Sequence, residues 1–178
     1  MKRFANKLMV GDFRLLYFIN HKLSCKVLDS MMPLITHLGG AIFTITFTLA
    51  LMFFGTNSVR LLGYEVAFSL ASSHLIVHIV KRKVNRERPH IVEEMIQQFD
   101  VPICEYSFPS GHTTAAFAVA NILAYNLPQF ATIILGIATL IAISRMYLGV
   151  HYPSDVMAGF LVATTFARIT HYLFNVIL

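Results

Sequence analysis

Apolar residues fill five long segments of this chain, and short polar stretches separate them. The segments cover about residues 31–54, 61–80, 110–127, 130–143 and 153–173. A helix needs about 20 apolar residues to cross the hydrocarbon core of a bilayer, and most of these segments approach that length. The pattern therefore predicts an all-α integral membrane protein, a helical bundle of about five antiparallel transmembrane helices.

The N-terminal residues follow a different pattern, in which apolar positions such as Leu15 are mixed with charged ones such as Asp12. An amphipathic helix of this kind lies in the membrane interface and does not cross the bilayer. We therefore expect an interfacial helix at residues 1–30, followed by the transmembrane bundle at 31–178. Both parts would belong to one domain, 1–178.

The composition supports a membrane location and excludes several other classes. Of the 178 residues, 56% are hydrophobic and only 13% are charged, whereas a soluble domain carries about 25% charged residues. The net charge is +5, but the basic residues flank the apolar segments without a stripe of interleaved aromatic residues, so no nucleic-acid partner is expected. Two cysteines, Cys25 and Cys104, are too few for a disulfide framework or a metal site. Two free thiols are favoured, and a pair between them stays open.

The antiparallel topology brings four segment ends to one membrane surface. The second and fourth segments end there, and the third and fifth begin there. Three polar clusters lie at these ends, at residues 81–89, 109–112 and 144–155. Because nothing in their linear separation requires this convergence, the clusters indicate a single site.

The first cluster is rich in basic residues. If the helix of the second segment continues past the bilayer, Lys81, Asn85 and Arg88 lie on one face of it. Arginine offers a planar donor fork that suits phosphate oxygens, and lysine adds a point charge. A basic anchor at the membrane edge is the preferred interpretation of three further residues, Arg82, Lys83 and Arg86.

The second cluster is the tetrapeptide Pro109-Ser-Gly-His112. Ser110 can cap a helix start, and Gly111 lets a ligand approach the backbone closely. Unpaired amides at a helix N-terminus bind phosphate, and His112 could exchange a proton with a leaving or entering oxygen. Taken alone, the tetrapeptide favours an ordinary capped helix with an interfacial histidine.

The third cluster, Ser144 to Asp155, interrupts a very apolar part of the chain with an arginine, a histidine and a carboxylate. If a helix starts at His151, then His151 and Asp155 share one face of it. A lone pair of this kind favours a structural contact. The presence of Arg145 and the convergence with the other clusters favour a phosphate-transfer site, with His151 as its nucleophile.

Together the three clusters resemble the complete three-part signature of the type 2 phosphatidic acid phosphatase superfamily. In this sequence its parts read Lys81-x6-Arg88-Pro89, Pro109-Ser-Gly-His112 and Ser144-Arg145-x5-His151-x3-Asp155. Each part alone is weak evidence, but all three in order and spacing are highly specific. Many membrane members of this superfamily have six spans, so an N-terminal interfacial helix would be a departure from the usual topology.

The resemblance implies a metal-independent phosphatase mechanism. It implies that His151 attacks phosphorus and forms a phosphohistidine, that Asp155 orients its ring, and that His112 acts as general acid. No metal and no other cofactor is implied. The phosphoryl oxygens would be held by Lys81, Arg88, Ser110, Gly111 and Arg145.

The implied substrate is a membrane lipid phosphate, either a lipid phosphomonoester or an isoprenyl diphosphate. Phosphatidylglycerol phosphate, phosphatidic acid and undecaprenyl diphosphate fit equally well. The alternative hypothesis is a protein that binds or transports lipid phosphates without turnover, although binding alone would not need the trio His112, His151 and Asp155. A homodimer stays open.

The side of the membrane that carries the site is suggested by the basic residues. Of the 14 Lys and Arg residues, only Arg60 and Arg168 fall toward the opposite surface. The positive-inside tendency therefore favours the cytoplasmic side of a bacterial cell membrane, whereas many bacterial relatives act on the outer face. We further expect Glu65 to pair with Arg60, and His171 to extend toward the surface opposite the site.

Overall fold

Helices form the regular structure of the described residues, 2–101 and 105–177, in the computed structural model of this chain, and no strand occurs among them. This confirms the all-α prediction. In chain order the elements are α1 (Lys2–Tyr17), a π-helical turn (Phe18–Lys22), α2 (Lys26–His37), α3 (Ala41–Phe54), α4 (Asn57–Val84), α5 (Pro89–Val92), α6 (Gly111–Asn126), a 3-10 turn (Pro128–Phe130), α7 (Ala131–Tyr147) and α8 (Pro153–Ile177).

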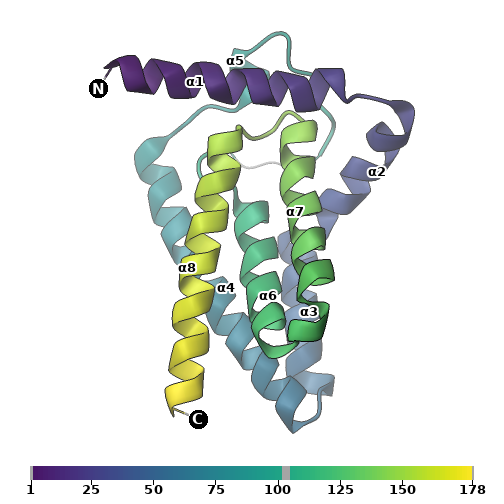
Figure 1. Cartoon of the computed structure of the whole chain (residues 1–178), viewed down its shortest axis with the longest axis vertical. Coiled ribbons are helices and arrows are strands. Elements are labelled where there is room, and N and C mark those ends of the chain that lie inside the picture. Colours follow the sequence, from purple (N-terminus) through teal and green to yellow (C-terminus); the bar gives the residue numbers. More distant parts are fainter. Residues whose placement is uncertain (1, 102–104, 178) are drawn as a thin grey trace.

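The longer helices run side by side, and α1 lies across one end of the bundle (Figure 1). The N-terminus and α5 lie at that same end, whereas the C-terminus lies at the other. The last turns of α4 and α7 and the first turns of α6 and α8 meet beneath α1, as the antiparallel topology predicts.

Helix α6 occupies the centre of the bundle and is buried along most of its length. Small side chains let the neighbouring helices approach it closely. Ala115 and Ala118 are almost completely buried on α6. On α8, a Cβ atom added to Gly159 would lie only 2.7 Å from the backbone oxygen of Ser110. The start of α6 is thereby held directly against α8.

Three helical segments are long and apolar enough to cross a membrane among the described residues, and they contain α4, α7 and α8. The bent pair of α2 and α3 would make a fourth span. The multi-pass helical bundle is confirmed, but the number of five spans is not. Helix α6 has 16 residues, fewer than the roughly 20 that span a bilayer alone.

The predicted first span is broken at Gly39 and Gly40, where α2 and α3 meet at an angle of 49°. The break packs against the start of α6. A Cβ on Gly39 would lie 2.6 Å from Cγ2 of Ile141 and 3.0 Å from the backbone oxygen of His112. Only a residue without a side chain fits there unless its neighbours move, so the glycines allow a close contact at a bend in the predicted span.

The N-terminal helix lies across the bundle end, as expected for an interfacial helix (Figure 1). Its apolar residues face two ways, since Leu16 is completely buried whereas Met9 and Val10 are at least half exposed. An exposed apolar surface beside the bundle suits the interface of a bilayer. Helix α2 begins at Lys26, five residues before the predicted start of the bundle at residue 31.

Candidate active site

The eight residues to which the signature assigns catalysis or phosphate binding belong to element ends and loops at the end of the bundle that α1 covers (Figure 1). Five of their side chains belong to residues that are almost completely buried: Arg88, Ser110, Arg145, His151 and Asp155. Buried charges are costly unless they are paired or hydrogen-bonded. Their concentration at one place therefore marks this end as the candidate site.

Two cations reach the site, Lys81 from the last turn of α4 and Arg88 from the chain that follows this helix. Lys81 Nζ donates a hydrogen bond of 2.9 Å to the backbone oxygen of Tyr106, and Arg88 Nη2 donates one of 3.2 Å to the same oxygen. Arg88 Nη1 donates to the backbone oxygen of Val150 at 2.6 Å and lies 3.4 Å from His151 Nε2. The guanidinium therefore stands directly beside the imidazole.

The condition under which Lys81 and Arg88 would share a helix face is not met. Helix α4 ends at Val84, and Asn85 adopts the left-handed conformation with φ 48° and ψ 39°. Asparagine tolerates this conformation better than most residues. Arg88 then lies on extended backbone before α5. It approaches the site from a loop, with its own hydrogen bonds fixing the side chain.

The start of α6 is capped as predicted. Ser110 Oγ accepts hydrogen bonds from Thr113 N at 3.4 Å and from Thr113 Oγ1 at 2.9 Å. With its oxygen so engaged, the hydroxyl hydrogen of Ser110 remains available to a ligand. A Cβ added to Gly111 would meet nothing within 4 Å. Open space therefore adjoins the first amides of α6, which suits the approach of an anion.

Arg145 and His112 both contact the region where α2 meets α3. Arg145 Nη1 donates a hydrogen bond of 2.7 Å to Thr36 Oγ1, and Thr36 is almost completely buried. A Cβ on Gly40 would lie 3.7 Å from His112 Nε2, so the imidazole faces the glycine pair. Thr36 is a residue of the site that the sequence pattern did not predict. A threonine inside an apolar segment was its only signal.

His151 lies two residues before the first residue of α8, not on the helix, so the conditional prediction of a shared helix face does not hold. Its Nδ1 is nevertheless 3.6 Å from Asp155 Oδ2. That oxygen also accepts the Tyr152 backbone N–H at 2.8 Å. One side of the imidazole thus faces a carboxylate, and the other side faces Arg88.

The surroundings keep the imidazole of His151 neutral. Burial lowers its pKa well below the ordinary 6.5, and the positive charges of Arg145, Arg88 and Lys81 lower it further. The hydrogen then belongs on Nδ1, facing the carboxylate, which leaves the lone pair on Nε2 toward the cations. A neutral imidazole in this orientation can attack an electrophile bound between Arg88 and the start of α6.

The interpretation of Arg86 as a membrane-edge anchor is wrong. Arg86 Nη1 donates a hydrogen bond of 2.8 Å to Asp155 Oδ1, and Nη2 contacts Asp12 Oδ2 at 2.9 Å. Arg82 and Lys83 are exposed, which agrees with the anchor interpretation for those two residues. Nothing in the sequence pattern indicates which of the three cations turns inward.

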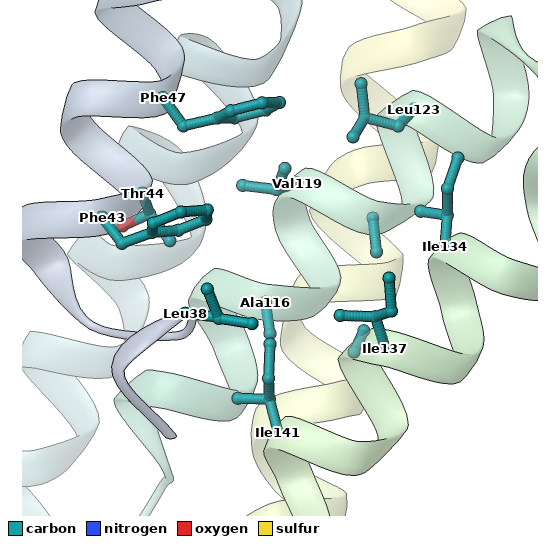
Figure 2. A pocket seen from close by; sticks show the side chains of 12 residues that line it. Leu38, Phe43, Thr44, Phe47, Ala116, Val119, Leu123, Ile134, Ile137 and Ile141 are labelled. Carbon is teal, nitrogen blue, oxygen red and sulfur yellow. The ribbon is translucent and has the colours of Figure 1, made fainter. Parts of the chain in front are cut away.

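An apolar groove of about 240 Å³ opens beside the site between α3, α6 and α7 (Figure 2). Figure 2 shows Phe43 and Phe47 of α3 across from Ile134 and Ile137 of α7, with Val119 of α6 between them. Ile141, at the site end of the groove, also lies against Gly39, where an added Cβ would come within 2.6 Å of Ile141 Cγ2. The groove therefore leads from the apolar flank of the bundle toward the candidate site.

A metal ion needs an arrangement of three or more ligating side chains close together. Among residues 2–101 and 105–177, no group of three or more His, Cys, Asp or Glu side chains is arranged to hold a metal ion. Cys25 is exposed, whereas Cys104, and with it the possible pair between the two cysteines, lies outside the described residues.

Comparison with known proteins places this chain in a family. Lipid A 1-phosphatase of Rhizobium johnstonii is 29% identical over 120 residues, which are 65% of this chain and 49% of that protein. Phosphatidylglycerophosphatase B of Bacillus subtilis is 32% identical over 147 residues, 75% of this chain and 68% of that protein. The chain thus spans about half the length of the first relative and about two thirds of the second.

A solved structure has the same fold. It is the first transmembrane PAP2 type phosphatidylglycerolphosphate phosphatase from Bacillus subtilis, with a TM-score of 0.80 and 26% identity, and the match covers 97% of this chain and 89% of that one. The sequence model of the PAP2 superfamily matches residues 62–177. These residues contain all three signature parts, and the chain belongs to the PAP2 superfamily.

Proposed function

We propose that this protein is a membrane lipid phosphatase that removes the terminal phosphate of a lipid phosphomonoester or an isoprenyl diphosphate. The observation that carries the proposal is the environment of His151, a buried neutral imidazole between the Asp155 carboxylate and the Arg88 guanidinium. Histidine held in this way is a nucleophile, and the surrounding cations are suited to an attacked phosphoryl group.

In the first half of the proposed reaction, His151 Nε2 forms a bond to phosphorus while the bond from phosphorus to the leaving oxygen breaks. His112 donates a proton to that oxygen. The imidazole of His151 becomes positively charged as the bond forms. The Asp155 carboxylate, 3.6 Å from Nδ1, stabilises this charge. Five groups hold the non-bridging oxygens: Lys81, Arg88, Arg145, the Ser110 hydroxyl and the Gly111 amide.

In the second half, His112 removes a proton from water as the water oxygen bonds to phosphorus. The bond between phosphorus and Nε2 breaks, and inorganic phosphate leaves. Both histidines return to their starting protonation states, because the proton taken from water replaces the one given to the leaving oxygen. The cations and the start of α6 supply the charge stabilisation, so this mechanism uses no metal ion.

Two features support a lipid substrate. The site lies at one end of a membrane bundle, where a headgroup can reach it while the chains stay in the bilayer. The groove between α3, α6 and α7 offers an apolar surface beside it, lined by aliphatic and aromatic side chains (Figure 2). We propose that one hydrocarbon chain of the substrate lies in this groove. The candidates remain phosphatidylglycerol phosphate, phosphatidic acid and undecaprenyl diphosphate.

The deciding experiment measures phosphate release by the purified protein in detergent from these three lipids, with His151→Ala as control. We expect release from at least one lipid, no release by the variant, inhibition by vanadate and no inhibition by EDTA. An obligatory magnesium requirement would overturn the metal-free mechanism. Tight binding of a lipid phosphate without release from any of the three would instead support the binding or transport hypothesis.

We further propose that the site faces the cytoplasm in a bacterial cell membrane, on the basis of the basic residues around it. Cys25 is exposed at the site end, just before α2. Impermeant thiol reagent added to intact cells should therefore label Cys25 only after lysis. Labelling of Cys25 in intact cells, absent in Cys25→Ser, would place the site on the outer face.

A further inference from the structure

The Asp155 carboxylate is completely buried and is held at both oxygens. Oδ2 accepts the Tyr152 N–H at 2.8 Å and lies 3.6 Å from His151 Nδ1. Oδ1 accepts a hydrogen bond of 2.8 Å from Arg86 Nη1. A buried carboxylate keeps its charge and its orientation only where donors and cations compensate for lost water. Arg86 therefore contributes directly to the state of the group that faces His151.

The guanidinium of Arg86 is itself fixed from several sides. Nη1 also donates to Ser154 Oγ at 2.7 Å, and Nη2 donates to Asp12 Oδ2 at 2.9 Å. The Cζ atom lies 3.9 Å from the centre of the Tyr152 ring. Because a guanidinium is a rigid planar fork, these contacts fix the direction of the bond to Asp155.

Asp12 brings helix α1 into the same network. Its Oδ1 accepts the backbone N–H of Ser154 at 2.9 Å, and its Oδ2 accepts the Ser154 hydroxyl. Ser154 is the second residue of α8, and its N–H is one of the amides that the helix itself leaves unpaired. Asp12 thus caps α8 from another helix and at the same time binds Arg86. Its side chain is only 10% exposed.

We propose that Asp12 and Arg86 are positioning residues, which hold the Asp155 carboxylate against His151 and make helix α1 part of the active site. The inference rests on the proposed phosphatase function. Neither residue occupies a specified signature position, since Arg86 falls in the unspecified stretch between Lys81 and Arg88, and Asp12 lies outside the segment that matches the family model. Arg86 acts through Asp155, and Asp12 acts through Arg86 and the start of α8.

The test compares Asp12→Asn and Arg86→Gln with the unchanged protein in the same lipid phosphatase assay. Asparagine can still accept the Ser154 N–H through its carbonyl oxygen but carries no charge for Arg86. Groups that hydrogen-bond to an active-site side chain without touching the substrate typically contribute about 10–100-fold. We expect kcat to fall by roughly this factor for Arg86→Gln and less for Asp12→Asn. KM and the inhibition constant of vanadate should change by less than about threefold, because neither side chain touches the phosphate.

Two further measurements separate positioning from a purely structural role. In the Arg86→Gln background, Asp12→Asn should lower kcat by less than about twofold, because its effect passes through Arg86. Arg86→Lys, which keeps a cation near Asp155, should recover part of the lost kcat. The exposed neighbour Arg82 provides the control, and Arg82→Gln should leave kcat unchanged. Rates are taken per folded protein, measured by the near-ultraviolet circular dichroism signal.

Normal kcat in both Asp12→Asn and Arg86→Gln would overturn this inference alone. Losses that simply add in the double variant, or that vanish when the rate is corrected for folded protein, would overturn it too. Absence of turnover in the unchanged protein on all three candidate lipids would overturn the proposed function and this inference together.

Discussion

His151 combines complete burial with three nearby cations, which has a measurable consequence for its protonation. The lowered pKa means that the imidazole loses its proton at a lower pH than an ordinary histidine. We therefore expect the titration midpoint of His151 to lie below the 6.5 of an ordinary imidazole, so that the group is neutral at pH 7. Side-chain nitrogen NMR of the histidine-labelled protein in micelles measures this directly. His151→Gln identifies its signals, and a midpoint at or above 6.5 would contradict the prediction.

Gly111 offers a test in which stability and activity move in opposite directions. Nothing lies within 4 Å of a Cβ added there, so Gly111→Ala should fold normally. It should even raise the free energy of unfolding by about 0.5–1 kcal/mol, because alanine loses less backbone entropy in a helix. The same methyl group would occupy the space through which we expect the phosphate to reach the amides. We expect phosphate release to fall by at least about tenfold.

Gly136 of α7 is the matched control for this substitution, since it too has open space around the added Cβ. Gly136→Ala should raise stability by a similar amount and leave phosphate release unchanged. Equal activity of the Gly111→Ala and Gly136→Ala variants would show that no substrate approaches the start of α6.

At the scale of the elements, the groove between α3, α6 and α7 predicts a dependence on chain length. Val119→Phe on α6 would fill part of the groove (Figure 2). Displacing two methylene groups of a bound chain costs about 1.6 kcal/mol, or roughly 15-fold in kcat/KM. We expect this loss for dipalmitoyl phosphatidic acid and little change for a short-chain analogue. Ile133→Phe, on an exposed face of α7, is the control. Equal losses for both lipids would argue against the groove.

The helices themselves follow from the sequence because apolar segments and turn residues mark them directly. The signature residues follow too, since each interrupts an apolar segment where the topology brings ends together. Two local features of the backbone do not follow from the pattern of apolar and polar residues. Asn85 ends α4 by adopting a left-handed conformation, and the first span bends at Gly39, where Ile141 and the start of α6 leave no room for a side chain. Both depend on packing by residues far away in the chain.

The missed site residues have the same physical origin. Arg86 stands among several flanking cations, and its inward direction depends on the turn that Asn85 makes. Its partner Asp12 is 74 residues away, on a helix whose charged residues all suit a solvated face. The Thr36 hydroxyl oxygen accepts a hydrogen bond from Arg145, which lies 109 residues further along the chain. Which polar side chains become partners depends on how the helices pack against one another, and the sequence pattern of a single helix does not contain that information.

At the end of the bundle opposite the site, Glu65, Asn126 and His171 form a polar cluster. The partners of Glu65 in this cluster differ from the predicted partner, Arg60. His171 Nδ1 lies 2.6 Å from Glu65 Oε1, and Asn126 Nδ2 donates to Oε2 at 2.9 Å. The predicted pairing of Glu65 with Arg60 is therefore wrong, whereas His171 contacts Glu65 and keeps a side chain that is 29% exposed. The three residues belong to α4, α6 and α8, so the cluster joins the helices whose other ends carry the site.

This separation predicts that stability and catalysis can be changed independently. Along α8, Asp155 and His171 are about 24 Å apart at 1.5 Å per residue. Glu65→Ala removes two hydrogen bonds and leaves a partly buried histidine without its carboxylate. Hydrogen bonds between membrane helices contribute about 0.6–1.7 kcal/mol each. We therefore expect the free energy of unfolding to fall by about 1–3 kcal/mol, and Tm in detergent by several degrees.

Glu65→Gln, which keeps a hydrogen-bonding side chain, should lose less stability. Below the melting transition, kcat of both variants should equal that of the unchanged protein. A loss of kcat without a change in Tm would mean that the two ends are coupled, which would contradict the prediction.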